Sequence, residues 1–361
     1  MDVVYGIPIL GVLFQFIGYI IEVTPGIAPI VLGLATPVAF GALCGVMNER
    51  SGIVNIGIEG MMLSAAFAGF LAAGLWAQAF PADPFSGPFS ASPALLVGLL
   101  VAIVTAMALS ALHAWLSISI GADQIISGVI INIAAIGLTG YLNRVLITPN
   151  PRLGAGTFST FRLPREVTEL PVIGWLLEMF FEQGPIAMSL IVFVIVLQVL
   201  LFRSRWGLRT RAVGEHPRAA DTVGIDVIRL RYRNVIVAGV FAGLAGAYLT
   251  LEGTGSFQNE MTAGRGFIAL AAVIFGRWTP IGAFAGALLF MYSQALGQAV
   301  RIKAPGPEYP DLGAIIAAIP TQVYGVLPYI LTIIILAGVV GRSIAPAAVG
   351  RPYQKEGKAA A

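Results

Sequence analysis

The chain has 361 residues, of which 57% are hydrophobic and 11% are charged, and its formal net charge is +3. A soluble domain carries about 25% charged residues, so this chain lacks the side chains needed to cover a water-facing surface. Its apolar runs exceed the ~20 residues that cross a ~30 Å hydrocarbon core, and uninterrupted runs of this length exclude a barrel of short alternating strands. The composition predicts an all-α polytopic membrane protein, and the small net charge does not indicate a nucleic-acid partner.

In chain order, the apolar runs predict nine membrane spans, at residues 3–21, 27–47, 61–79, 94–119, 125–147, 185–203, 234–251, 280–300 and 321–341. Two shorter apolar pieces, 266–275 and 313–320, cannot cross alone. We therefore expect eight to ten crossings, with some broken helices, in a single transmembrane domain over residues 1–345. The first run has no basic flank and no small-residue cleavage site, so we interpret it as an uncleaved span.

The distribution of basic residues predicts the orientation, because Lys and Arg near span ends stay in the cytoplasm. The loop 203–233 contains eight arginines and three acidic residues, and the chain from residue 342 onward also has a basic excess. The segment 148–184 contains three arginines and four glutamates. We expect the loop 203–233 and the tail 346–361 to be cytoplasmic and the segment 148–184 to be extracytoplasmic.

The first polar interruption, NERSGIVNIGIEG, occupies residues 48–60. Its glycines and β-branched residues make a continuous helix improbable. If 54–63 were a helix, Asn55 and Glu59 would share one face and could line a substrate pathway. Alternatively, Glu59 caps the span that follows it. Glu49 and Arg50 are better explained as structural residues that pair with each other or with neighbours near the cytoplasmic end of the preceding span.

Two further polar stretches are candidate pathway segments. In EGTGSFQNEMTAGRG, residues 252–266, a polar loop precedes a short helix, which is typical of binding sites at the membrane midplane. Phe257 could stack on a base, and Gln258 and Asn259 could hydrogen-bond a substrate. The alternative is an ordinary external loop. Near the C-terminus, Gln322 and Tyr324 lie among prolines and a glycine in a kinked polar spot that could also line the pathway.

Motifs of ATP-binding, metal-binding and hydrolytic proteins are missing from the sequence. It contains no GxxxxGK[ST], no HExxH and no CxxC, and His113 and His216 stand alone. We therefore predict no catalytic residue, no metal site and no cofactor bound by this chain. His113, on an apolar span, is expected to be a buried histidine with satisfied hydrogen bonds.

The basic loop contains AVGEHPRAADTVGID, residues 212–226. Pro217 suits the first position of a helix, and Gly224 suits a left-handed C-terminal stop. These residues predict a helix of about two turns, which is too short to be stable alone and must dock onto something. Ala219 and Ala220 favour close contact with a protein partner. The alternative is a helix lying on anionic headgroups.

Four blocks of the sequence also carry a family resemblance. GEHPRAADTVGI resembles the cytoplasmic loop of permease subunits of ATP-binding-cassette (ABC) importers in the ribose, branched-chain amino acid and nucleoside superfamily. NERSGIVNIGIEGMMLSAAF, VIFGRWTPIGAFAGALLF and LPYILTIIILAG resemble its nucleoside branch. These blocks run from residue 48 to 338 and so cover most of the chain.

The resemblance implies the ABC importer permease fold and a nucleoside permease in the bacterial inner membrane. It further implies a second related permease, a cytoplasmic ATPase that holds ATP and Mg²⁺, and an extracytoplasmic substrate-binding lipoprotein. The loop 212–226 would then contain the helix that couples the permease to the ATPase. Its candidate residues are Glu215, Pro217, Arg218, Ala219, Ala220, Asp221 and Gly224. Two alternatives remain: a permease for a sugar or a branched-chain amino acid, and an ion-driven secondary transporter with Glu59 as its buried acid.

Overall fold

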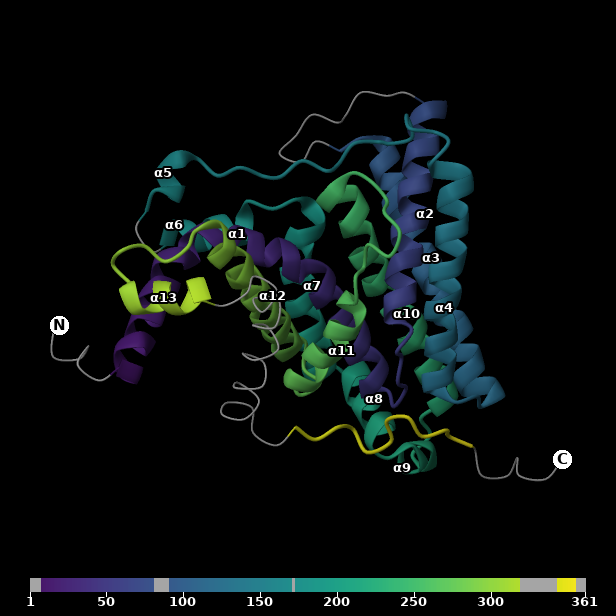
Figure 1. The fold of residues 1–361 in the computed structure, drawn as a ribbon. Helices are drawn as coiled ribbons and strands as arrows, with labels where there is room; N and C mark the ends of the chain where they lie inside the picture. Colours follow the sequence, from purple (N-terminus) through teal and green to yellow (C-terminus); the bar gives the residue numbers. More distant parts are fainter. Residues whose placement is uncertain (1–7, 81–90, 171–172, 319–342, 355–361) are drawn as a thin grey trace. The chain divides into compact units, whose positions relative to one another are not determined.

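The computed structural model describes residues 8–80, 91–170, 173–318 and 343–354, which are mainly helical (Figure 1). Two compact units form the chain, each built from segments far apart in the sequence. The first unit contains residues 1–35, 162–183 and 288–341, and the second contains residues 36–161, 184–287 and 342–361. The prediction of a single domain over residues 1–345 stays a prediction.

The α-helices are α1 (Pro8–Arg50), α2 (Ile58–Ala79), α3 (Pro93–Ala114), α4 (Gln124–Leu142), α5 (Arg165–Thr168), α6 (Ile173–Phe181), α7 (Pro185–Arg203), α8 (Arg205–Glu215), α9 (Pro217–Thr222), α10 (Val227–Ala247), α11 (Arg265–Phe275), α12 (Pro280–Ile302) and α13 (Pro310–Ala318). Three π-helical turns extend the C-terminal ends of α3, α4 and α10, as η2 (Trp115–Ile120), η3 (Asn143–Ile147) and η4 (Tyr248–Thr254). Within the described residues, seven helices are long and apolar enough to cross a membrane. This confirms the all-α polytopic fold, whereas the expected span 321–341 lies outside the described residues.

The prediction of two spans at 3–21 and 27–47 is wrong, because α1 runs as one helix through both. The helix contains Pro25, although a proline inside a helix removes one backbone hydrogen bond. In the first unit, the Thr24 hydroxyl bonds the Ile20 carbonyl oxygen at 2.6 Å and the Tyr292 hydroxyl at 2.6 Å. The second of these bonds ties the helix next to Pro25 to α12 of the same unit.

The first unit is held together by contacts that close its N-terminal helix onto α13. The Gln15 side-chain oxygen accepts from the backbone N–H groups of Asp311 and Leu312, at 3.1 and 3.0 Å. These bonds cap the exposed N–H groups at the start of α13. An ion pair of 2.7 Å between Lys303 and Glu22 adds to this contact.

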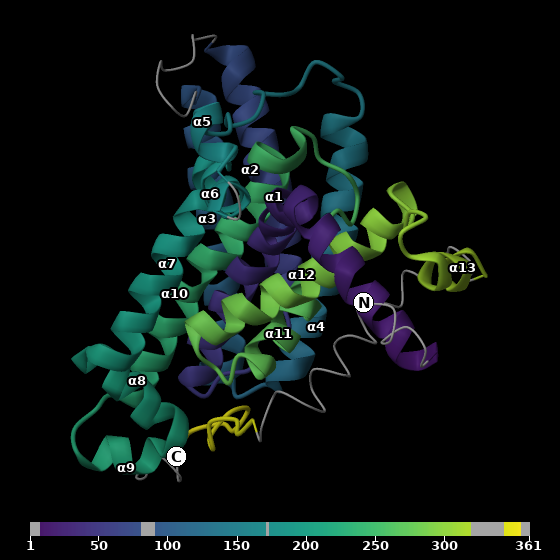
Figure 2. The ribbon, with the colours of Figure 1, turned by 90° about the vertical axis from the view of Figure 1, so that its left-hand side faces the viewer.

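The core of the second unit is formed by α2, α3 and α10, which make its most extensive helix contacts and lie side by side in Figures 1 and 2. Small residues allow this close approach. A Cβ atom on Gly98 would lie 2.7 Å from the carbonyl oxygen of Gly69, so the backbones of α2 and α3 meet directly. Near one end of these helices, Leu63, Phe67 and Phe70 pack with Leu153 and Phe257 in a buried apolar cluster.

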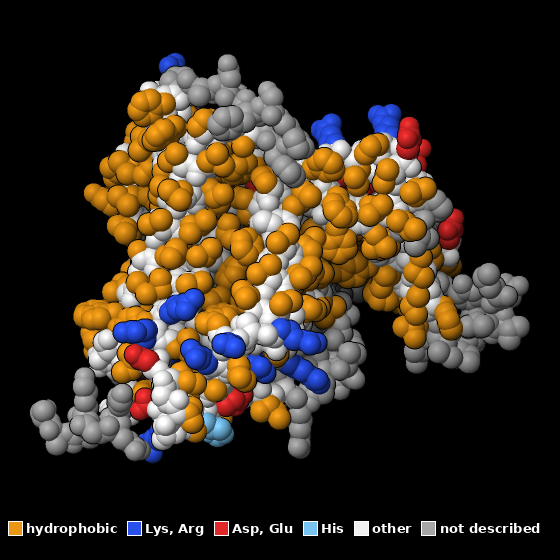
Figure 3. Space-filling model, turned by 180° about the vertical axis from the view of Figure 1, so that it is seen from behind, with side chains coloured by type: hydrophobic (Ala, Val, Ile, Leu, Met, Phe, Trp, Pro, Cys, Tyr) orange, Lys and Arg blue, Asp and Glu red, His pale blue; other side chains and the backbone are white. Residues whose placement is uncertain are grey.

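The outward faces of α3, α4 and α7 are apolar. On α4 the exposed side chains include Ile125, Ile126, Val129, Ile130, Ile133, Ile136 and Leu138. Figure 3 shows broad areas of apolar surface, with many of the Lys and Arg side chains gathered at one end. Such faces suit contact with lipid, and the basic end suits the membrane–water interface.

Candidate functional site

The basic loop forms two short helices and not the single one that the sequence predicted. The predicted helix is present as α9, with Pro217 at its first position, and Gly224 follows it with a left-handed φ of +83°. A second helix, α8, precedes it and is capped by the Ser204 hydroxyl, which accepts from Gly207 N at 3.1 Å. The span expected at 234–251 also starts earlier, since α10 begins at Val227. The prediction followed apolar runs, and arginines interrupt these runs in α8 and in the first turns of α10. Both helical stretches were therefore missed.

The two alanines of α9 have opposite environments. Ala220 is buried and belongs to a cluster with Val213 of α8 and Val227 of α10, against which Tyr353 of the C-terminal segment packs. Ala219 is exposed. Ala220 therefore anchors α9 to the chain itself, and a role in coupling stays a prediction for both alanines. Ala219 remains available on the outer face.

The segment 343–354, here called the C-terminal segment, is tied to the rest of the second unit by backbone bonds. Ala348 N donates to Gly214 O at 2.9 Å, and Ala347 N donates to the Glu215 carboxylate at 3.1 Å. Gly350 N donates to Gly52 O at 3.2 Å. Figures 1 and 2 show this segment passing α8 and α9 at one end of the unit.

Arg231 of α10 links the same elements from inside. Its side chain is 2% exposed, and its guanidinium donates to the carbonyl oxygens of Ser51 and Arg351, at 3.1 and 3.2 Å. A buried cation normally needs several such partners to offset its desolvation. Arg231 therefore joins the end of α1 to the C-terminal segment. The sequence analysis counted this arginine only as an orientation signal and missed its structural role.

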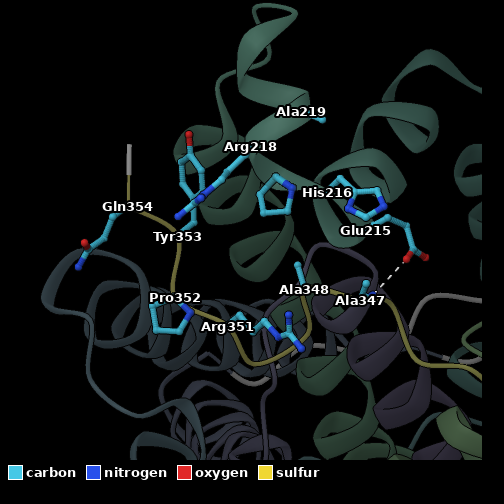
Figure 4. A pocket seen from close by; sticks show the side chains of 11 residues that line it. Glu215, His216, Arg218, Ala219, Ala347, Ala348, Arg351, Pro352, Tyr353 and Gln354 are labelled. Carbon is cyan, nitrogen blue, oxygen red and sulfur yellow. Dashed lines mark hydrogen bonds between the residues drawn. The ribbon is translucent and has the colours of Figure 1, made fainter. Parts of the chain in front are cut away.

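An open pocket of about 650 Å³ lies between α9 and the C-terminal segment (Figure 4). Its lining includes six of the chain's polar or aromatic side chains: Glu215, His216, Arg218, Arg351, Tyr353 and Gln354. Glu215 was predicted as a coupling residue, and the structure places its carboxylate at the pocket wall in contact with Ala347 N. Asp221, another predicted residue, lies on α9 but does not line the pocket.

The interruption at 48–60 is a true break, since α1 ends at Arg50 and α2 begins at Ile58. Gly52 follows α1 with a left-handed φ of +89°, a conformation that ends helices. Within the break, residues 51–57, side chains from α3 and α4 satisfy the backbone. Val54 N donates to Gln124 Oε1 at 2.7 Å, and Val54 O accepts from His113 Nε2 at 2.9 Å. His113 is therefore a buried histidine with satisfied bonds, as expected.

Asn55 and Glu59 do not share a helix face, because Asn55 lies before α2 begins. Asn55 is fully buried and accepts from Gly57 N at 3.0 Å, which makes a local turn. The Glu59 carboxylate accepts from Gly264 N at 2.8 Å and Gly266 N at 2.5 Å. Glu59 therefore caps a helix, but the helix is α11 and not its own. A role in a substrate pathway stays a prediction for both residues.

Glu49 and Arg50 have the structural role that the sequence analysis assigned to them. Glu49 accepts a hydrogen bond from the Trp278 indole, and Arg50 Nε donates to Trp278 O at 2.7 Å. Arg50 Nη2 also donates to Arg277 O at 3.1 Å. Arg277 and Trp278 adopt left-handed φ values of +51° and +53°, which are uncommon for residues other than glycine. Their carbonyls are held by Arg50, so the charged end of α1 supports a strained turn.

In the second polar stretch the three candidate residues have different surroundings. Phe257 is 7% exposed and packs edge-on against Phe67, with ring centroids 5.2 Å apart. Gln258 and Asn259 are exposed, and the Asn259 side chain accepts from Asn143 Nδ2 at 2.9 Å. The structure therefore places Phe257 in the apolar core and the two amides at the surface. The remaining candidates, Gln322 and Tyr324, lie outside the described residues.

Glu252 was noted only as one of several charges, and the structure gives it a defined contact. Its carboxylate accepts from Ile186 N at 2.7 Å and Ala187 N at 3.1 Å, so it caps the first turn of α7. Among the residues that the structure describes, no cluster of His, Cys, Asp or Glu could hold a metal ion. The second unit is a helical membrane unit whose basic end contains the pocket between α9 and the C-terminal segment.

Seven membrane-length apolar helices among the described residues, with a basic end, define a polytopic membrane protein. Residues 27–344 match the family described as branched-chain amino acid transport system / permease component. The chain belongs to this family.

Its curated relatives are also permeases. It is 36% identical over 345 residues to the guanosine ABC transporter permease protein NupQ of Bacillus subtilis, covering 93% of this chain and 98% of that one. It is 36% identical to the nucleoside ABC transporter permease protein NupC of Lactococcus lactis, covering 89% of this chain and 94% of that one. It is 34% identical to a putative glucose ABC transporter permease protein of Haloferax volcanii, covering 89% of this chain and 95% of that one.

The same two bacteria contain a second, more distant match each: NupP of B. subtilis, at 26% identity over 77% of this chain, and NupB of L. lactis, at 24% over 72%. No solved structure matched the chain.

Proposed function

We propose that this chain is the permease subunit of an ABC importer that moves nucleosides across the bacterial inner membrane. The observation that carries the proposal is its 36% identity to two permeases named for guanosine and nucleoside transport, over 89% or more of the chain. ATP would be hydrolysed by a partner, because the sequence has no phosphate-binding loop of its own. ATP and Mg²⁺ would bind that partner and not this chain.

The proposed partners are a second permease, a cytoplasmic ATPase and an extracytoplasmic substrate-binding lipoprotein. The paired relatives NupQ with NupP, and NupC with NupB, support a second permease. For the ATPase we propose α9 as the coupling helix, with Ala219 and Arg218 on its exposed side. This assignment places the loop 203–233 and the C-terminal segment in the cytoplasm, in agreement with their basic excess.

In this mechanism the closure of the ATPase pair displaces α9, and α9 transmits the displacement through its contacts. Ala220 anchors α9 against α8 and α10, and α10 belongs to the core of the second unit. A displaced α9 therefore moves a packed membrane helix and not an isolated loop. ATP changes the preferred state only if it binds the two states with different affinity.

Reconstitution into proteoliposomes tests the proposal. The chain with its second permease, its ATPase and its binding protein should take up labelled guanosine or another nucleoside only when ATP is present on the ATPase side. Uptake by this chain alone under a proton or Na⁺ gradient would refute the ATP-driven mechanism and favour a secondary transporter.

A sugar is the second candidate substrate, because one relative is named a putative glucose permease. Thermal-shift screening of the associated binding protein separates the candidates. Stabilisation by nucleosides and not by sugars or branched-chain amino acids is expected. Stabilisation by glucose alone would replace the nucleoside assignment without affecting the assignment as a permease.

A further inference from the structure

The C-terminal segment has the contacts of a structural element and not of a loose tail. Its backbone bonds reach Gly214 and Glu215 at the end of α8 and Gly52 after α1. Arg231 holds it from inside through Arg351 O. A segment fixed at this many points is already ordered. A partner that binds it therefore avoids the loss of conformational entropy that ordering a flexible tail would cause.

The pocket that this segment forms with α9 is predominantly basic. Arg218 comes from α9, Arg351 comes from the C-terminal segment, and His216 lies between the two elements in the lining (Figure 4). Glu215 is the one acidic residue in the lining, and it already accepts from Ala347 N. Arg218 also has an interaction within the chain, so its part in binding is to add positive charge beside Arg351. Two guanidinium charges, one from each wall, favour a carboxylate.

We propose that α9 and the C-terminal segment together form one socket for the ATPase partner, and that an acidic segment of that partner inserts between Arg218 and Arg351. The inference rests on the proposed function, since it names a second contact surface for the same ATPase. The docking surface then has two walls, and the coupling helix supplies one of them.

The shape and chemistry of the pocket favour a protein segment over a lipid surface. The open pocket has a volume of about 650 Å³, into which a loop or a helix end fits. Tyr353 and Gln354 add an aromatic ring and an amide to the lining, and aromatic side chains are enriched in the centres of protein interfaces. A flat layer of headgroups would contact the outer arginines of the loop and would leave the two walls of this open pocket unused.

Site-specific crosslinking tests the socket. Cys44 is the single cysteine of the chain and is fully buried, so a cysteine introduced at the surface can be labelled selectively. A maleimide photo-crosslinker would be attached to Gln354→Cys, to Ala219→Cys and to Leu208→Cys, a control on the exposed side of α8. Each variant is then assembled with its ATPase in native membranes and illuminated.

Adducts with the ATPase are expected from positions 219 and 354, and not from position 208. An adduct from 219 alone would overturn the socket and leave the coupling helix in place. No adduct from either position would refute the proposed function itself. An adduct of position 354 with phospholipid in place of the ATPase would show that the segment faces the membrane surface, which also overturns the inference.

Charge reversal tests the acidic occupant. Arg351→Glu keeps the backbone carbonyl that Arg231 binds, and only the side chain in the pocket changes. Arg218→Glu and Arg351→Glu should each weaken ATPase binding by about tenfold at low salt, and the loss should shrink as salt is raised. Arg351→Lys should keep most of the affinity because it keeps the charge.

Arg229→Glu is the matched control, because this arginine belongs to the same loop, its side chain is 86% exposed, and it does not line the pocket. Its effect should stay within about twofold, as for an exposed surface charge. Thiol-dye labelling of Cys44 on heating confirms that each variant is folded. Equal effects of Arg351→Glu and Arg229→Glu in folded proteins would overturn the acidic occupant.

Discussion

Replacing Glu59 with glutamine tests whether this residue caps α11 or lines a pathway. The carboxylate accepts two backbone N–H bonds, from Gly264 and Gly266, and is 7% exposed. A glutamine has one acceptor oxygen, so one of the two N–H groups would face the amide NH₂ group without a partner. The shape is conserved, and the change therefore isolates charge and hydrogen bonding.

The expected loss of stability follows from these two bonds. A hydrogen bond to a charged group contributes about 1.5–3 kcal/mol, and an unsatisfied buried N–H group costs a further ~1–3 kcal/mol. The neutral amide of glutamine also interacts more weakly than a carboxylate with the N-terminus of α11. This difference costs about a few tenths of a kcal/mol, the lower end of the range for a charge at a helix terminus. Together these effects predict that Glu59→Gln destabilises the second unit by about 3–6 kcal/mol.

The chain contains its own reporter for this measurement. Cys44, the single cysteine, is fully buried in α1 within the second unit, so its reaction with a thiol-specific dye on heating reports unfolding of that unit. Glu260→Gln is the matched control, since Glu260 is exposed in the same polar stretch and the charge change is identical. The labelling midpoint should fall by several degrees for Glu59→Gln and stay unchanged for Glu260→Gln.

Nucleoside uptake, measured at equal expression, then separates the two roles of Glu59. If capping is its role, uptake and stability should fall together. A Glu59→Gln variant with an unchanged labelling midpoint and lost uptake would refute the capping argument and support the pathway hypothesis.

Four further substitutions test the remaining structure. Arg231→Met leaves two carbonyl oxygens without a donor, so amide exchange in residues 343–354 should speed up by at least about tenfold in hydrogen-exchange measurements; unchanged exchange would contradict the link. Ala220→Leu should destabilise the second unit by about 1–3 kcal/mol through overpacking and so lower the labelling midpoint. Ala219→Leu should leave the midpoint unchanged and weaken only ATPase binding, and the reverse pattern would contradict the orientation of α9. Glu252→Gln should increase amide exchange in the first turn of α7, and protection equal to wild type would argue against the cap.

Local chemistry explains what could be predicted from the sequence. Apolar runs long enough to cross a bilayer predicted helices at most of the observed places, because backbone groups in lipid must be satisfied within a helix. The order of Pro217 and Gly224 predicted the start and the stop of α9 for equally local reasons. Apolar runs failed to predict that α1 is one helix, since they do not contain contacts such as the bond from Thr24 to the distant Tyr292.

The candidate site was predicted only in part. The coupling helix was found from its motif, whereas the opposite wall of the pocket was missed, since residues 347–354 are more than 120 positions away from α9 in the sequence. Their basic character was interpreted as a topology signal. Nothing in their order indicates that Ala347 and Ala348 bond to the end of α8.

The sequence by itself determined the membrane class, the break after Arg50, the helix at Pro217 and the family of this protein, because each depends on residue types and short spacings. Tertiary structure alone decided which helix Glu59 caps, which alanine of α9 faces inward, and what the C-terminal segment contacts. These features join residues separated by more than a hundred positions, as between Glu59 and Gly264. Packing selects the partner of each side chain, because it brings the unsatisfied backbone groups of one helix end next to that side chain.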